Sequence, residues 1–432
     1  MYVQTLHIYN LRCFTKQIVP LCYPGAPSEK PLPLENVTVL VGNNGAGKTT
    51  ILRACALATL SPVLQQSGLV PHHLVRRPIG RGTLKKPYEA IVKAVALLHK
   101  QDVGRAASSR PEDLLARLQP RGKSNYDFLE TSRVPSSRID DIFDERSPSF
   151  FVVGYGATRR VEAGEEDAGS RSKRRTVRYQ RVAGLFEDHV ALRPMERWLP
   201  QVRRNRGRFK EVVDLLNDLL PDDMRFDGRF IDGEFYFERG RTYVPFTALS
   251  DGYRAFVGWV SDLLGHMSDC CSGRGKLREL TGLVLVDEVD LHLHPEWQRH
   301  VVPNLSRLFP KLQFVFSTHS PIVAGTLTSQ NLRVMESASD GSTNVKQYTE
   351  RVHGLGADQV LMSAYFDMKT TRSPDFEDEL DLLARKATGG DGHAAIAYIQ
   401  RLAGAEPEEV EASRKSRLRV GRNGPAKLQR AT

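Results

Sequence analysis

Hydrophobic positions recur along this chain with the spacings of both strands and helices. Apolar and polar residues alternate over 3–14 (VQTLHIYNLRCF), which predicts an edge strand, and the stretch 89–98 (EAIVKAVALL) also predicts a strand. Apolar runs predict further strands at 37–41, 150–156, 282–287 and 313–318. Helical spacing predicts helices at 49–60, 195–202, 209–220, 250–267, 295–309, 376–387 and 393–403. From 247 onward helices and strands alternate, which predicts a parallel sheet covered by helices.

The middle of the chain has a different pattern. Residues 101–148 are polar and weakly periodic, so we expect loops with one short helix around 112–118 (EDLLARL). The stretch from 194 to 230 predicts a compact helical lobe, followed by a hairpin at 230–240 (FIDGEFYFERG). These changes of pattern place boundaries near residues 100, 245 and 345.

The composition is that of a globular protein with a large core. Of 432 residues, 40% are hydrophobic and 26% are charged. No apolar run approaches the roughly 18 to 20 residues that cross a bilayer, and the first residues lack the basic and apolar regions of a signal peptide. We therefore expect a cytoplasmic protein with no membrane partner. The five cysteines show no CxxC spacing, which indicates reduced, structural thiols.

The net charge of +10 raises the possibility of a nucleic-acid partner. Much of the excess lies in two stretches, 159–181 and 413–430. Solvated flexible segments and a surface that faces DNA or RNA explain these stretches equally well.

The strongest chemical signal is 42–49 (GNNGAGKT), a full match to the P-loop pattern G-x-x-x-x-G-K-[ST] between a predicted strand and a predicted helix. Backbone N–H groups of such a loop and the start of the helix bind phosphates, while Lys48 reaches the β- and γ-phosphates and Thr49 binds Mg²⁺. The predicted ligands are therefore ATP and Mg²⁺. The predicted contacts are Gly42, Asn43, Asn44, Gly45, Ala46, Gly47, Lys48, Thr49 and Thr50.

A second signal is 283–288 (LVLVDE), a buried strand that ends in two acids. Asp287 lies where it can hold Mg²⁺ through water, and Glu288 is the candidate general base that activates the attacking water. Two further stretches follow the same order along the chain. Ser250 and Asp251 in 249–254 (LSDGYR) suit a helix start or a second anion site, and His319 in 317–320 (STHS) follows an apolar strand.

These four motifs, together with 10–14 (NLRCF), resemble the ABC-type ATPases of the RecF/SMC/OLD group. The stretches YGATRR, LSDGYR and DEVDLHLHPEWQR are most similar to small ATP-binding proteins that include the ATPase subunit of Septu-type and retron-associated antiphage systems. The resemblance covers about 1–20, 36–60, 150–160 and 245–325. It implies an α/β P-loop NTPase fold of ABC-ATPase type, with a mixed sheet flanked by helices and an inserted helical lobe.

The same resemblance assigns roles to residues. It implies that Ser250 and Gly252 contact the γ-phosphate bound by a second copy, that Asp290 lies in a D-loop and that His319 is a switch histidine. It also implies a nucleotide contact for Arg12. Lys48, Glu288 and His319 are then the catalytic set. The expected parts are the N-terminal ATPase part (1–100), the inserted loops and lobe (101–245), the C-terminal ATPase part (246–345), and C-terminal helices with a basic disordered tail (346–432).

Two departures from the family pattern stand out. The magnesium-binding glutamine of the Q-loop has no assigned position, because 150–156 runs into 157–160 (ATRR) with no Gln. Either Tyr155 to Arg159 take over that region, or the Q-loop lies elsewhere in the middle of the chain. His292 and His294 lie two residues apart near Asp290, a spacing that suits a metal site. A motif that follows the D-loop is the alternative, which the resemblance favours.

The sequence supports an ATPase that forms a head-to-tail homodimer, or a higher oligomer, on ATP and regulates a separate partner. One interpretation is the regulator of a nuclease or toxin effector in antiphage defence, and another is a RecF-like DNA repair clamp that binds DNA directly. A third is a nuclease of OLD type, but the stretch after His319 contains no DxD pair for its metals.

Overall fold

The structure is a computed structural model, and it describes residues 1–27, 33–77, 89–99, 102, 111–121, 125–130, 143, 150–161, 176–271 and 275–403. Contacts divide the chain into two compact units, Met1–Asp367 and Met368–Thr432. The basic stretch 413–430 and most of 159–181 lie outside the described residues.

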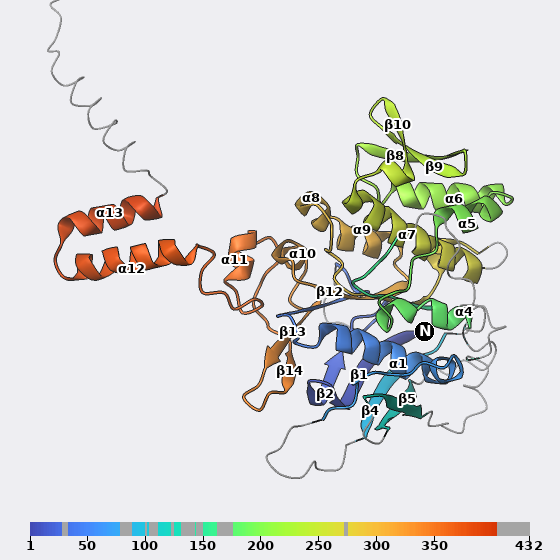
Figure 1. Cartoon of the computed structure of the whole chain (residues 1–432), viewed down its shortest axis with the longest axis horizontal. Helices are drawn as coiled ribbons and strands as arrows, with labels where there is room; N and C mark the ends of the chain where they lie inside the picture. The colour runs from blue at the N-terminus through green and yellow to red at the C-terminus, as the bar shows by residue number, and fades with distance from the viewer. Residues whose placement is uncertain are drawn as a thin grey trace, which may run out of the picture. The chain divides into compact units, whose positions relative to one another are not determined.

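The centre of the first unit is a six-stranded sheet in the order β14-β13-β3-β12-β11-β7. Figure 1 labels β12, β13 and β14 of this sheet. All neighbours are parallel except β13 and β14. Its strands are β3 (Val37–Gly42), β7 (Val152–Tyr155), β11 (Gly282–Val286), β12 (Leu312–Thr318), β13 (Leu332–Ser337) and β14 (Thr343–Lys346). The predicted strands at 37–41, 150–156, 282–287 and 313–318 are confirmed.

A second, antiparallel sheet has the order β2-β1-β4-β5-β6. Its strands are β1 (Tyr2–Leu11), β2 (Phe14–Pro20), β4 (Ala90–Leu97), β5 (Glu112–Pro120) and β6 (Asp127–Glu130). Helix α1 (Lys48–Gln66) lies between the two sheets, because its apolar side chains share one core with strands of both. Leu283 and Leu285 of β11 face this core, while Val284 and Val286 face the other.

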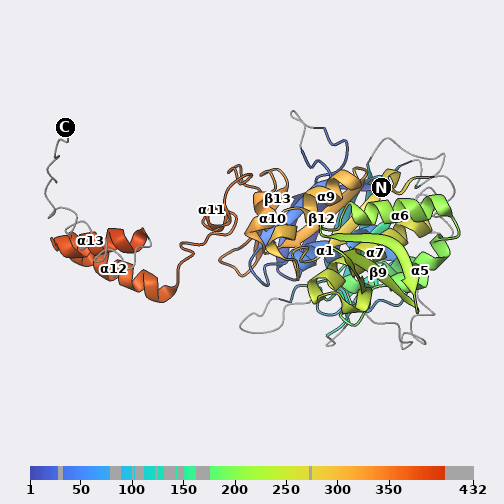
Figure 2. The same cartoon turned by 90° about the horizontal axis from the view of Figure 1, so that it is seen from above.

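The opposite face of the parallel sheet is covered by helices. Helix α7 (Asp251–Cys270) shares that core with a lobe made of α5 (Met195–Val202), α6 (Arg206–Asn217) and a small sheet in the order β10-β9-β8. These strands are β8 (Met224–Ile231), β9 (Glu234–Arg239) and β10 (Thr242–Pro245). Figures 1 and 2 both show the lobe beside α7. The predicted helices and hairpin are confirmed, with β10 added to the hairpin.

Several short helices connect these parts. They are α4 (Val177–Gln180), α8 (Pro295–Gln298), α9 (Val301–Leu308), α10 (Pro321–Gly325) and α11 (Ala357–Leu361). The described part of the second unit consists of α12 (Pro374–Thr388) and α13 (Gly392–Leu402), which pack against each other. Within the residues that the structure describes, no helix is long and apolar enough to cross a membrane.

Three predictions about elements were wrong. The strand that begins at Tyr2 is not an edge strand, because β2 and β4 pair with its two sides. Residues 112–118 form part of β5 instead of a helix, because pairing with β4 and β6 overrides the helical propensity of Glu, Leu and Ala. The predicted helix at 295–309 is split into α8 and α9, since Pro303 has no N–H to continue a helix through residue 299.

Candidate nucleotide site

The P-loop connects β3 to α1, and its glycines have backbone conformations that other residues avoid. Gly42, Gly45 and Gly47 have φ values of 150°, 77° and 102°. A Cβ atom at Gly47 would lie 2.5 Å from the Cys13 sulfur and 2.8 Å from the Phe14 ring. The loop therefore packs directly on the turn between β1 and β2.

The other predicted loop residues differ in burial. Asn43, Asn44 and Gly45 are exposed at the tip of the loop, whereas Ala46 is buried, as is Thr50 in the first turn of α1. A Cβ at Gly45 would have no atom within 4 Å. The exposed backbone at this tip leaves room for a phosphate chain, as the motif requires.

Lys48 is bound across the loop. Its Nζ donates hydrogen bonds to the carbonyl oxygens of Gly42 at 2.7 Å and Asn43 at 3.0 Å. Burial lowers the pKa of Lys48, and the carboxylates of Asp287 and Glu288 oppose that shift. The ammonium group therefore lies close to the acidic end of β11, between the two motifs.

The structure brings the two predicted magnesium ligands into contact. The Thr49 hydroxyl donates a hydrogen bond of 2.6 Å to Oδ2 of Asp287, 238 residues away in the sequence. The Ser317 hydroxyl donates to Oδ1 of the same carboxylate. A carboxylate and a hydroxyl side by side form the oxygen donor set that Mg²⁺ prefers, so these residues fit the predicted ion.

Glu288 follows Asp287 in a tight backbone turn. Its φ of 48° lies in the left-handed region, which is uncommon for a residue with a side chain. Its N–H donates to the Ser317 hydroxyl at 2.7 Å. Ser317 thus holds both Asp287 and Glu288 in place. Sequence analysis did not assign this role to it.

Arg159 holds the same turn from the other side. Its Nη1 donates to the Asp287 carbonyl oxygen at 2.7 Å, and its Nη2 donates to that of Glu288 at 2.8 Å. Burial lowers the pKa of Arg159 to about 10, although Asp287 and Glu288 favour its charged form. The YGATRR stretch pointed to this region, but no signal in the sequence revealed main-chain partners so distant along the chain.

His319 lies just beyond the end of β12 and is half-buried. Burial lowers its pKa, and the nearby charge of Lys48 adds to that shift, while the carboxylates of Glu288 and Asp290 oppose it, so the net effect favours the neutral imidazole. The Thr318 hydroxyl donates to the Asp290 carboxylate. This bond joins the end of β12 to the segment predicted as the D-loop.

Ser250 is the N-cap of α7 and is exposed. In the described structure its side chain makes no capping bond to that helix. Gly252 lies against the segment after β11, because a Cβ there would be 2.6 Å from the carbonyl oxygen of His292. Tyr253 contacts Trp297 edge to face at 4.4 Å. The start of α7 is therefore packed on the segment that follows β11 in its own chain, from His292 to α8.

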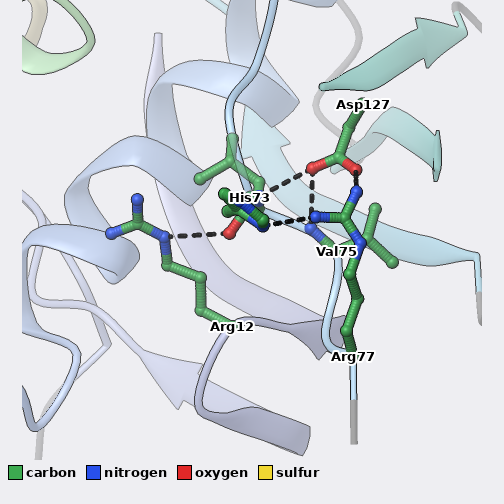
Figure 3. A network of polar contacts seen from close by, with 6 residues as sticks. Arg12, His73, Val75, Arg77 and Asp127 are labelled. Atoms are coloured by element: carbon green, nitrogen blue, oxygen red, sulfur yellow. Dashed lines mark hydrogen bonds and ion pairs between the residues drawn. The ribbon is translucent and has the colours of Figure 1, made fainter. Parts of the chain in front are cut away.

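Arg12 lies in the turn that contacts the P-loop, with φ of 47°. Its N–H donates to the Leu74 carbonyl oxygen at 2.8 Å, and its Nε approaches that of His73 at 3.4 Å. The buried Asp127 accepts bonds from the N–H groups of Leu74 and Val75 and holds this segment in place (Figure 3). Its other oxygen accepts from Arg77 at 2.6 Å. Burial lowers the pKa of Arg12.

Of the two histidines after the predicted D-loop, His294 has a structural role. The Nδ1 of His294 accepts a bond from the N–H of Glu296 at 3.3 Å and caps α8. His292 has φ of 64°. Among the residues that the structure describes, no group of three or more His, Cys, Asp or Glu side chains is arranged to hold a metal ion.

The order of the motifs and their convergence at the edge of the parallel sheet agree with a known family. The profile described as "AAA domain, putative AbiEii toxin, Type IV TA system" matches residues 37–324, more than half of the chain. The chain belongs to this family. It is an AAA-family ATPase domain, and the matched region contains the P-loop, the pair Asp287 and Glu288, and His319.

Named relatives support the resemblance to Septu and retron ATPases. The chain is 24% identical over 380 residues to the Septu protein PtuA of Bacillus mycoides (strain KBAB4), which covers 88% of this chain and 46% of that protein. It is 23% identical over 409 residues to the Retron Vc95 probable ATPase of Vibrio cholerae serotype O1 biovar El Tor, covering 79% and 76%. Over 154 residues it is 36% identical to the Retron Ec83 probable ATPase of Escherichia coli, covering 35% and 28%. The chain thus spans about half the length of the Septu relative.

A solved structure has the same fold. The Smc head bound to the C-terminal winged-helix domain of ScpA aligns with a TM-score of 0.50 at 12% identity, covering 81% of this chain and 98% of that one. The predicted fold class, a P-loop NTPase of ABC-ATPase type, is confirmed.

Proposed function

We propose that this chain binds ATP with Mg²⁺ and hydrolyses it in composite sites formed by two copies arranged head to tail. The observation that carries the proposal is the contact between Thr49 of the P-loop and Asp287, with Lys48 and Glu288 beside it. A phosphate-binding loop, an oxygen donor pair and a general base are the parts that phosphoryl transfer to water requires.

The residues of the site then divide the work. The exposed P-loop backbone and Lys48 bind and orient the phosphates. Glu288 positions the attacking water and accepts its proton, while neutral His319 accepts or donates a hydrogen bond beside it. Mg²⁺, held by Thr49 and Asp287, would neutralise charge on the β- and γ-phosphate oxygens.

The second copy would complete each site. The hydroxyl of Ser250 makes no capping bond within its own chain, and the start of α7 carries the positive end of the helix dipole. We place Ser250 and Gly252 at the γ-phosphate bound by the other copy, with Asp290 across the interface. Energy from closing this dimer would switch a bound partner.

We infer that the bound partner is a separate effector protein. The similarity to the Septu and retron relatives supports a role in antiphage defence. We propose that the partner in this role is a separate nuclease or toxin that the chain holds in check. The net charge of +10 favours the second candidate, a RecF-like clamp that binds DNA directly.

One purification tests both the proposed ATP hydrolysis and the proposed partner. The variants Lys48→Ala and Glu288→Gln are tagged and purified from the native host with ATP and Mg²⁺, and Lys93→Ala, on β4, is the control. Glu288→Gln should retain ATP and lose hydrolysis by at least about 100-fold. Lys48→Ala should retain no nucleotide, and Lys93→Ala should match the wild type. Equal hydrolysis by the wild type and Glu288→Gln would overturn the assignment of the base.

The protein and nucleic acid recovered with Glu288→Gln identify the partner. Mass spectrometry that finds a stoichiometric nuclease or toxin supports the defence role. Nucleic acid alone, released at high salt, supports the DNA clamp, because counterion release makes phosphate contacts salt-sensitive.

A further inference from the structure

We propose that Arg159 is a positioning residue that sets the orientation of Glu288 and links it to helix α7. This inference rests on the proposed function, since it concerns the same general base. Arg159 occupies the stretch after β7, where the magnesium-binding glutamine of the family was expected and not found.

The first step of the argument is the backbone of the turn. Glu288 has φ of 48°, a conformation that costs about 1 kcal/mol or more for a residue with a side chain. Such a turn persists only where its surroundings hold it. The guanidinium of Arg159 binds the carbonyl oxygens of Asp287 and Glu288, which lie on the two sides of the Glu288 Cα, at 2.7 and 2.8 Å.

The second step is the chemistry of the contact. The planar guanidinium presents two parallel N–H groups, so it can bind both carbonyl oxygens at once and fix their relative direction. A lysine at this position carries the same charge but cannot make the same two-point contact. The carboxylates of Asp287 and Glu288 also attract the cation, so charge and geometry act together.

The third step is the connection to α7. The guanidinium lies over the ring of Trp259, 5.9 Å from its centroid. Tyr155, from the same stretch as Arg159, contacts Trp259 and donates a hydrogen bond of 2.7 Å to the buried Asp262. Both partners belong to α7, whose N-cap is Ser250. A shift of α7 on dimer closure would therefore reach the Glu288 turn through Arg159.

The experiment compares Arg159→Lys and Arg159→Gln with Arg160→Gln, a matched control at the exposed neighbouring arginine. We expect both Arg159 variants to lower kcat by about 10- to 100-fold while the Kd for ATP changes less than about threefold. Arg160→Gln should leave both values unchanged. Thermal unfolding with and without ATP identifies the temperature range in which each variant is folded, and the assays are done there.

A second measurement distinguishes a role of Arg159 in positioning Glu288 from a general weakening of the active site. In the Glu288→Gln background, Arg159→Lys should cause no further loss of hydrolysis, because the group it positions is already absent. Losses that multiply in the double variant, or an Arg159→Lys protein with wild-type kcat, would overturn the inference. Failure of Lys48→Ala to abolish nucleotide binding would instead count against the proposed function, so the two failures are distinguishable.

Discussion

The glycines of the P-loop provide a test of the site at the level of single residues. At Gly47, a Cβ would lie 2.5 Å from the Cys13 sulfur, and the φ of 102° is strained for any other residue. We expect Gly47→Ala to lower the free energy of unfolding by about 1–3 kcal/mol and to weaken ATP binding by about tenfold or more. Chemical denaturation and calorimetric titration with ATP measure the two effects.

Gly45→Ala is the matched control for that substitution. Gly45 also has a positive φ, of 77°, but its Cβ would project into open space. Gly45→Ala should therefore lower the free energy of unfolding by about 1 kcal/mol, through backbone strain alone. Equal effects of the two substitutions would show that the contact between the P-loop and the turn at Cys13 has no part in the stability of the loop.

The residues that sequence analysis identified share one property. The P-loop, Asp287 and Glu288 are adjacent in the chain to a strand whose apolar run is visible, so motif and context reinforce each other. Arg159 also follows a predicted strand, but its partners could not be predicted, because they are carbonyl oxygens, which every residue carries. Ser317 was part of a predicted motif, but its bond to the Asp287 carboxylate depends on β11 and β12 being neighbours.

At the level of elements, the buried Gln313 forms one of the hydrogen-bonded links between the two sheets. Gln313 of β12 accepts a bond from the N–H of Val3 and donates to the carbonyl oxygens of Val3 and Cys22, all at 2.7 to 2.8 Å. We expect Gln313→Leu to lower the free energy of unfolding by about 2–4 kcal/mol, since it leaves three buried backbone groups without partners. Urea denaturation measures this change.

The same substitution at Gln119, an exposed residue of β5, is the control. Among the described residues, the side chain of Gln119 bonds that of Glu130 at the surface, so Gln119→Leu should change stability by less than about 0.5 kcal/mol. A loss at Gln313 no greater than that at Gln119 would mean that the sheets do not depend on this link.

Elements were predicted well where periodicity and propensity agree, and poorly where they conflict. Strand β5 shows the conflict. Leu114, Ala116 and Leu118 are buried and alternate as a strand requires, yet Leu115 between them and the surrounding Glu, Ala and Leu favour a helix. Pairing with β4 and β6 decides the outcome, and a single sequence does not display those partners.

At the level of the whole molecule, the proposed dimer depends on the exposed start of α7. We expect Ser250→Arg to abolish ATP-dependent dimerisation, because a large cation there would block the approach of a second P-loop. Binding of ATP to the monomer should remain within about threefold of the wild-type Kd, since Ser250 belongs to the other half of the site. Light scattering of the Glu288→Gln protein with and without Ser250→Arg gives the mass directly.

Thr247→Arg, three residues before Ser250 on an exposed site, is the control and should still dimerise. If the protein that carries both Ser250→Arg and Glu288→Gln doubles its mass when ATP is added, as the Glu288→Gln protein does, the head-to-tail arrangement is wrong.

The strand order of the parallel sheet has a consequence for synthesis of the chain on the ribosome. The neighbours β3 and β12 are separated by more than 250 residues, and β12 and β11 both insert between β3 and β7, which are made earlier. Strand β7 gains a partner in this sheet only when β11 has emerged, and β3 gains one only when β12 has emerged, so Thr49 of the P-loop helix meets Asp287 late in synthesis. The nascent chain must therefore keep strand edges unpaired for most of translation, and this interval is when a chaperone or premature aggregation would act on it.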